Sequence, residues 1–125
     1  MKKKETINFP SATLIQINGI EIEVFEAGKE NIGNPIVLCH GFPEHAFSWR
    51  FQIPALVKAG YHVIVPNQRG YGKSYKPKEV AAYDIINLTD DLVALLDYYN
   101  YKDATFMGHD WGANVVWHLA LLHPS

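Results

Sequence analysis

The stretch Gly108-His109-Asp110-Trp111-Gly112 joins a short apolar run directly to a helical pattern. Its spacing, glycine–x–acid–x–glycine, is typical of a sharp strand-to-helix turn that lifts the side chain of its central residue above a sheet. The two glycines leave room for strand and helix to approach closely. A carboxylate at the start of a helix also faces the positive end of the helix dipole. We therefore predict that Asp110 is ionised and acts as a nucleophile.

A second turn bears on whether Asp110 is catalytic or merely caps its helix, a role for which aspartate is also favoured. The motif His40-Gly41-Phe42-Pro43-Glu44 follows the apolar run 36–39. In an architecture with a nucleophile elbow, this position carries the second amide of the oxyanion hole. Two such turns in their expected places favour the catalytic interpretation, although the Gly-x-Asp-x-Gly spacing alone leaves both open.

The rest of the chain alternates between strand and helix patterns. A hairpin is predicted around the turn Asn18-Gly19. The other predicted strands are 36–39, 61–65 and 104–107, and the predicted helices are 47–59, 84–99 and 111–123. Such alternation predicts an α/β fold with a mostly parallel sheet, a leading antiparallel hairpin and helices on both faces.

Ligands of open parallel sheets bind beyond the carboxyl ends of the strands. Three unusual segments fall at such ends, namely 40–44, 67–72 and 108–112. We therefore expect the functional site where these segments meet.

Composition excludes several classes of protein. The chain has 125 residues, 48% hydrophobic content and a net charge of −2, which gives no indication of binding to nucleic acid or to an anionic membrane. No apolar run is long enough to span a bilayer. Cys39 is the only cysteine, so an internal disulfide is impossible and a reducing, cytoplasmic location is expected. Its apolar neighbours predict a buried, inert thiol.

The motifs together resemble the epoxide hydrolases of the α/β-hydrolase superfamily. The resemblance runs from about Phe9 to Pro124. It rests on the two turns above and on three further segments: Ser48-Trp49-Arg50, Gln52-Ile53-Pro54-Ala55-Leu56 and Arg69-Gly70-Tyr71-Gly72-x-Ser74. It implies an α/β-hydrolase fold and hydrolysis of a small apolar epoxide without metal or organic cofactor.

The resemblance also implies roles for particular residues. Asp110 would attack an epoxide carbon, and the backbone amides of Phe42 and Trp111 would form the oxyanion hole. His40, Pro43 and Trp111 would contact the substrate. Dehalogenases of the same superfamily are the alternative, but haloalkane dehalogenases usually have asparagine where Phe42 stands, and fluoroacetate dehalogenases favour arginine at Trp111.

One residue departs from the family pattern, because Asn67 stands where aspartate is usual before the Arg-Gly-Tyr-Gly segment. The base histidine, its orienting carboxylate and the cap tyrosines of the family would lie downstream of residue 125. We therefore expect residues 1–125 to be the N-terminal part of one domain, lacking the cap and the C-terminal half and inactive alone. A non-catalytic remnant used for binding is a third alternative.

Other polar residues suggest ordinary roles. Asp90 and Asp91 are expected on a solvated helix face, and Tyr98, Tyr99 and Tyr101 are expected to pack together. His62 has no distinctive placement.

Overall fold

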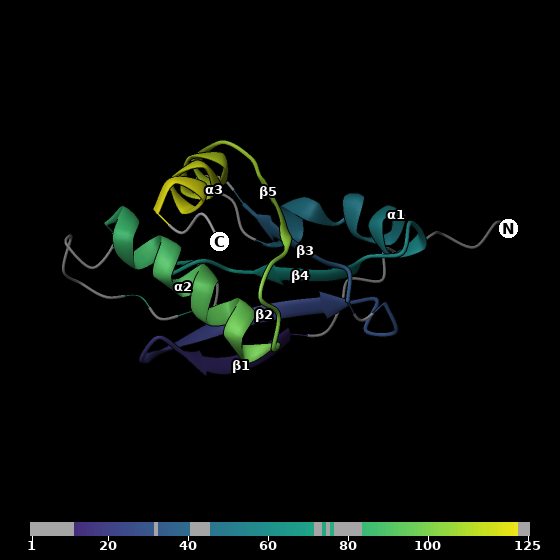
Figure 1. The fold of residues 1–125 in the computed structure, drawn as a ribbon, viewed down its shortest axis with the longest axis horizontal. Coiled ribbons are helices and arrows are strands. Elements are labelled where there is room, and N and C mark those ends of the chain that lie inside the picture. Colours follow the sequence, from purple (N-terminus) through teal and green to yellow (C-terminus); the bar gives the residue numbers. More distant parts are fainter. Residues whose placement is uncertain are drawn as a thin grey trace, which may run out of the picture.

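The computed structural model describes residues 12–31, 33–40, 46–71, 74, 76 and 84–122. Figure 1 shows the described elements arranged as a twisted sheet with helices packed against it. The strands are β1 (Ala12–Ile17), β2 (Ile20–Ala27), β3 (Pro35–Cys39), β4 (His62–Pro66) and β5 (Thr105–Gly108). The helices are the 3₁₀ turn η1 (Ala46–Trp49) and the α-helices α1 (Gln52–Lys58), α2 (Ile85–Tyr98) and α3 (Trp111–Leu122).

The sheet is mixed, with strand order β1-β2-β4-β3-β5. The hairpin strands β1 and β2 are antiparallel, and β2 is also antiparallel to β4. Strand β3 lies between β4 and β5 and is parallel to both. The carboxyl ends of these three parallel strands therefore meet at one edge of the sheet, which confirms the predicted fold class.

Alternate residues of the central strands face opposite layers of helices. Val37 and Cys39 belong to the core beneath α2 and α3, whereas Ile36 and Leu38 belong to the core that contains Trp49 of η1 and Ile53 of α1. All four strand residues are buried. Side chains that alternate between two covered faces explain why β3 reads as an uninterrupted apolar run.

The segment predicted as one helix, 47–59, is divided between η1 and α1. Pro54 explains the division, because a proline ring clashes with the carbonyl group four residues earlier, which is that of Arg50. Helix α1 instead begins at Gln52, so Pro54 lies in the first turn, where its missing N–H is harmless. Helix α2 begins as predicted, with the Asp84 side chain accepting a hydrogen bond from the Asn87 amide at 2.8 Å.

Strand β5 forms an edge of the described sheet, since it pairs with β3 alone. Beside it, α2, α3 and the 101–106 segment enclose an open groove of about 910 Å³. Met107, Trp117 and Leu121 are also exposed. Among the described residues, none of the helices combines the length and apolarity needed to cross a bilayer.

A polar cluster lies around His62, the first residue of β4, at the amino ends of the parallel strands. His62 Nδ1 lies 2.7 Å from the Tyr101 hydroxyl, and its Nε2 lies 2.5 Å from Glu26 Oε2. Tyr99 donates a long hydrogen bond of 3.5 Å to the same carboxylate. Burial, followed by the charge of Glu26, raises the pKa of Tyr99. The tyrosines thus do more than pack, and His62 joins β2, β4 and the α2–β5 connection.

Candidate active site

The backbone at residues 108–112 forms a tight strand-to-helix elbow. Strand β5 ends at Gly108, α3 begins at Trp111, and Asp110 between them has a φ of 57°. An L-residue in this left-handed region costs roughly 1–2 kcal/mol, although aspartate tolerates it better than most residues. The turn is closed by the Gly112 amide donating to the His109 carbonyl at 2.9 Å.

The φ of Asp110 distinguishes this turn from an ordinary helix cap. N-cap residues usually have extended backbone angles, as Asp84 does before α2 with φ −66° and ψ 163°. Asp110 instead has the left-handed geometry of a sharp elbow. Its side chain is exposed, as is that of His109, which lines a pocket of about 200 Å³ with Ser48, Trp49 and Gln52.

Close backbone packing accounts for both glycines of the motif. A Cβ at Gly108 would lie 2.5 Å from the Gly112 carbonyl oxygen and 2.6 Å from the Ala113 nitrogen. A Cβ at Gly112 would collide with the carbonyl oxygens of Cys39 and His40. The His109 amide donates to the Cys39 carbonyl at 3.1 Å. The elbow is therefore pressed directly against the end of β3.

Replacing Gly112 with alanine should lower the free energy of unfolding by about 3 kcal/mol or more, because two backbone segments must separate to admit the methyl group. Denaturant unfolding of the protein as its gene encodes it measures the change. Gly60→Ala is the control, since Gly60 has open space around it and its positive φ means that a methyl group adds only backbone strain there, whereas Gly112 has no positive φ and meets a steric clash. Equal losses in the two variants would contradict the packing argument.

The end of β3 is held from its other side by the segment that follows β4. The Gln68 amide donates to His40 Nε2 at 3.0 Å, and the Gln68 side-chain amide donates to the His40 carbonyl oxygen at 3.0 Å. The His40 ring packs edge-on against Tyr71, with centroids 4.5 Å apart. The three segments expected to meet at the carboxyl ends of the strands are thus joined through His40, which is buried.

A buried ion pair anchors this segment to α2. Arg69 donates to the two carboxylate oxygens of Asp91 at 3.0 and 2.9 Å, and Asn18 in the hairpin turn donates to the same carboxylate at 3.0 Å. Burial raises the pKa of Asp91, while the hydrogen bonds from Arg69 and Asn18 oppose that rise. The expectation that Asp91 lies on a solvated helix face is wrong, because its side chain is turned toward the sheet.

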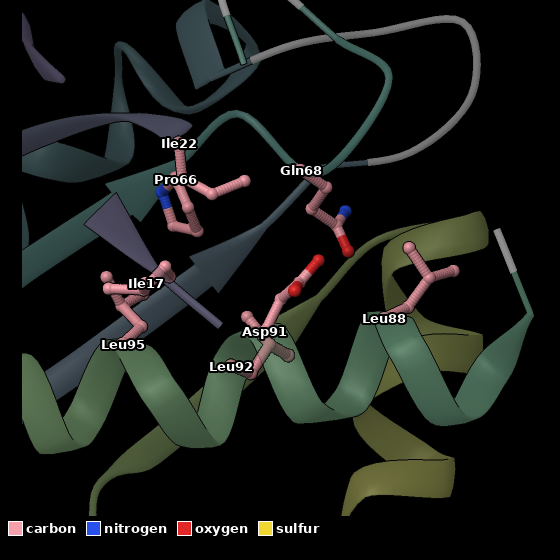
Figure 2. Close-up of a pocket in the computed structure, with 8 residues that line it drawn as sticks. All are labelled: Ile17, Ile22, Pro66, Gln68, Leu88, Asp91, Leu92 and Leu95. Atoms are coloured by element: carbon pink, nitrogen blue, oxygen red, sulfur yellow. The ribbon is translucent and has the colours of Figure 1, made fainter. Parts of the chain in front are cut away.

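Figure 2 shows the Asp91 carboxylate pointing from α2 toward the segment that carries Gln68. Both residues line a cavity of about 10 Å³ whose other walls are apolar. The remaining lining residues are Ile17, Ile22, Pro66, Leu88, Leu92 and Leu95. Beside an apolar wall, the carboxylate depends on Arg69 and Asn18 for its hydrogen bonds.

The structure thus brings together His40, the elbow and the segment after β4, while Phe42 and Pro43 lie outside the described residues. Trp111 is the first residue of α3, so its amide is one of those that lack an acceptor within a helix.

Burial raises the pKa of Cys39 to about 12, which fits an inert thiol. Within the described ranges, no three His, Cys, Asp or Glu residues gather as they would around a metal ion.

Comparison with known proteins places this geometry in a family. Residues 34–125 match the α/β hydrolase fold family. The chain is similar to epoxide hydrolase A of Mycobacterium tuberculosis, with 56% identity over 117 residues. It is also similar to the AB hydrolase superfamily protein YfhM of Bacillus subtilis, with 47% identity over 111 residues. These alignments cover 93% and 89% of the chain.

A solved structure supports the same assignment. The crystal structure of epoxide hydrolase A from Mycobacterium thermoresistibile matches 92% of the chain with a TM-score of 0.88 and 55% identity. The chain spans only 36% of that structure, and 36% and 38% of the two relatives above. With its elbow, its strand order and its matched family region, the chain belongs to the α/β hydrolase fold family.

Proposed function

We propose that this chain supplies the nucleophile part of an epoxide hydrolase that opens small apolar epoxides to diols. The observation that carries the proposal is Asp110, a non-glycine residue with φ 57° between a parallel strand and a helix. The similarity to named epoxide hydrolases supports the substrate class. The proposal extends to the whole protein, of which residues 1–125 would be the N-terminal part of a single domain.

The first step would be attack of an Asp110 carboxylate oxygen on one epoxide carbon. That carbon–oxygen bond breaks, an alkyl ester joins the substrate to Asp110, and the released alkoxide takes a proton from an acid. The resemblance to the family attributes this acid to tyrosines downstream of residue 125. The dipole of α3 favours the ionised carboxylate that starts the reaction.

The second step would be hydrolysis of that ester. Water attacks the ester carbonyl carbon, the tetrahedral oxyanion collapses, and the products are the diol and the Asp110 carboxylate. The amides of Phe42 and Trp111 are proposed to stabilise the oxyanion, and loss of one such donor typically costs about 2.7–4 kcal/mol. His40, Pro43 and Trp111 are proposed to contact the substrate. The resemblance to the family attributes the base for this step to a histidine downstream of residue 125. We also propose a cytoplasmic location for the protein, because Cys39 is its only cysteine.

The origin of the diol oxygens tests the mechanism. In a single turnover of styrene oxide in ¹⁸O-labelled water by the protein as its gene encodes it, the first diol should be unlabelled. Its oxygens come from the epoxide and from Asp110, whereas the label should enter the carboxylate of the peptide containing Asp110. Mass spectrometry of product and peptide measures both.

Other outcomes identify the alternatives. A labelled first diol would mean that water attacks the epoxide directly, and the nucleophile role of Asp110 would then be rejected. Halide release from a haloalkane without diol formation from epoxides would identify a dehalogenase. No turnover of either substrate would favour a binding role.

A further inference from the structure

Three consecutive polar residues after β4 are buried almost completely. Asn67, Gln68 and Arg69 are 3%, 6% and 6% exposed. Buried polar side chains are nearly always hydrogen-bonded, so the groups that they bind indicate what they hold in place. Arg69 binds α2, as described above. Asn67 and Gln68 instead contact the two ends of the connection between β3 and η1. Gln68 binds His40 before the connection, and Asn67 binds Ala46 after it.

Asn67 uses both ends of its side-chain amide. Its Oδ1 accepts a hydrogen bond from the Ala46 amide at 2.6 Å, and its Nδ2 donates to Glu23 Oε1 at 2.8 Å. The backbone beside it is equally fixed, since the Asn67 amide donates to the Glu23 carbonyl oxygen at 2.9 Å. The Ser74 hydroxyl donates to the Asn67 carbonyl oxygen at 2.5 Å. The Asn67 side chain is therefore held in one orientation by a donor on one side and a carboxylate on the other.

Gln68 acts on the other end of the same connection. Its two hydrogen bonds fix both the ring and the carbonyl group of His40. That carbonyl group is one of the two against which Gly112 packs. A change at the Gln68 side chain is therefore transmitted to the elbow through one residue.

We propose that Asn67 and Gln68 are positioning residues, which fix the backbone at Ala46 and His40 relative to the Asp110 elbow. This inference rests on the proposed function, in which the connection between His40 and Ala46 carries an oxyanion donor. Hydrolysis of the alkyl-enzyme should therefore depend on Asn67 and Gln68 more than its formation does. A misplacement of about 1 Å can slow a catalytic step by about 10²-fold.

Asn67→Asp tests the match between Asn67 and Glu23. The new carboxylate can still accept from Ala46, but it replaces the donor to Glu23 with a second buried acid. Two carboxyl groups in contact share one proton at low pH, and when that proton is lost as the pH rises the two negative charges repel each other. The rate of alkyl-enzyme hydrolysis should fall by about tenfold or more at alkaline pH and much less at acidic pH.

In the double variant Glu23→Gln with Asn67→Asp, the amide at position 23 would donate and the carboxylate at position 67 would accept, which is the reverse of the wild-type hydrogen bond. This variant should return the pH profile to that of the wild-type protein. Gln68→Met, which removes only the side-chain bond to the His40 carbonyl, should slow the same step without the new pH dependence. Asn34→Asp is the matched control, since Asn34 is exposed and its side-chain amide donates to the Gly60 carbonyl oxygen, far from the Asp110 elbow in the chain. A merely structural role would lower stability but leave the ratio of the two rates unchanged.

The experiment measures formation and hydrolysis of the alkyl-enzyme by rapid quench, together with hydrogen exchange of the Ala46 amide in the same proteins. Faster exchange at alkaline pH in Asn67→Asp, with slower ester hydrolysis, is the expected result. Unchanged exchange, or an unchanged ratio of the two rates in an active enzyme, would overturn the positioning inference alone. A wild-type protein that forms no alkyl-enzyme would overturn the proposed function, and the positioning role with it.

Discussion

Replacing Asp110 with asparagine is expected to abolish formation of the alkyl-enzyme and to reduce epoxide hydrolysis by about 10⁴-fold or more. The amide lacks the negative charge with which the carboxylate would attack an epoxide carbon. The fold should remain intact, because asparagine tolerates the left-handed backbone of Asp110 at least as well as aspartate does. Mass spectrometry of the denatured protein after mixing with substrate would detect the ester.

Two further variants make this result specific. Asp110→Ala should lose activity as well, but it should also lose about 1 kcal/mol of stability, because alanine is strained at a positive φ. Asp103→Asn, an exposed change in the same chain, should keep the wild-type rate. An Asp110→Asn protein that still forms the ester would contradict the assignment of the nucleophile.

The buried pair of Arg69 and Asp91 should give the largest change in stability. Removing either partner leaves a buried, uncompensated charge, which typically costs about 3–5 kcal/mol. Arg69→Met and Asp91→Leu should therefore each lower the free energy of unfolding by that amount. Denaturant titration of the protein as its gene encodes it measures both changes. Asp97→Asn, at an exposed position of α2, should change the value by less than about 0.5 kcal/mol.

The double variant Arg69→Met with Asp91→Leu should have a free energy of unfolding much closer to that of the wild-type protein than either single variant has. The raised pKa of Asp91 gives the reason. A carboxyl whose pKa is higher in the folded state than in the unfolded state binds its proton more tightly when folded. Its contribution to stability therefore declines as the pH rises through these two values. At neutral pH the ion pair thus gains little net stability over apolar residues, and strictly additive losses would contradict this account.

The elements that local sequence determines were predicted well. The hairpin turn at Asn18-Gly19, the capped start of α2 and the elbow around Asp110 lie within a residue of their expected places. Each depends on glycine spacing, a capping side chain or apolar periodicity over a few neighbours. The division of the predicted 47–59 helix also has a local cause, because a proline such as Pro54 is tolerated in the first turn of a helix but not in its interior.

The polar contacts across the sheet could not be predicted in the same way. Asp91 resembles any acid on an amphipathic helix, and Glu23 alternates with Glu21 like a residue on a solvated strand. Their partners, Arg69 and Asn67, lie far away in sequence and become neighbours only through the strand order. The unusual asparagine at position 67 was the one signal in the sequence, but nothing about it indicated a contact with Glu23.

The strand order also determines when during folding the elbow can form. Strand β5 is held by β3, so that Ile36 pairs with Thr105 and Cys39 with Gly108. The pairing closes a chain loop that contains β4 and α2. The entropic cost of closing a loop rises with its length. Contacts of such long sequence separation slow folding. We therefore expect the hairpin and helices to gain structure early from local contacts, and Asp110 to acquire its geometry later, when β5 docks against β3.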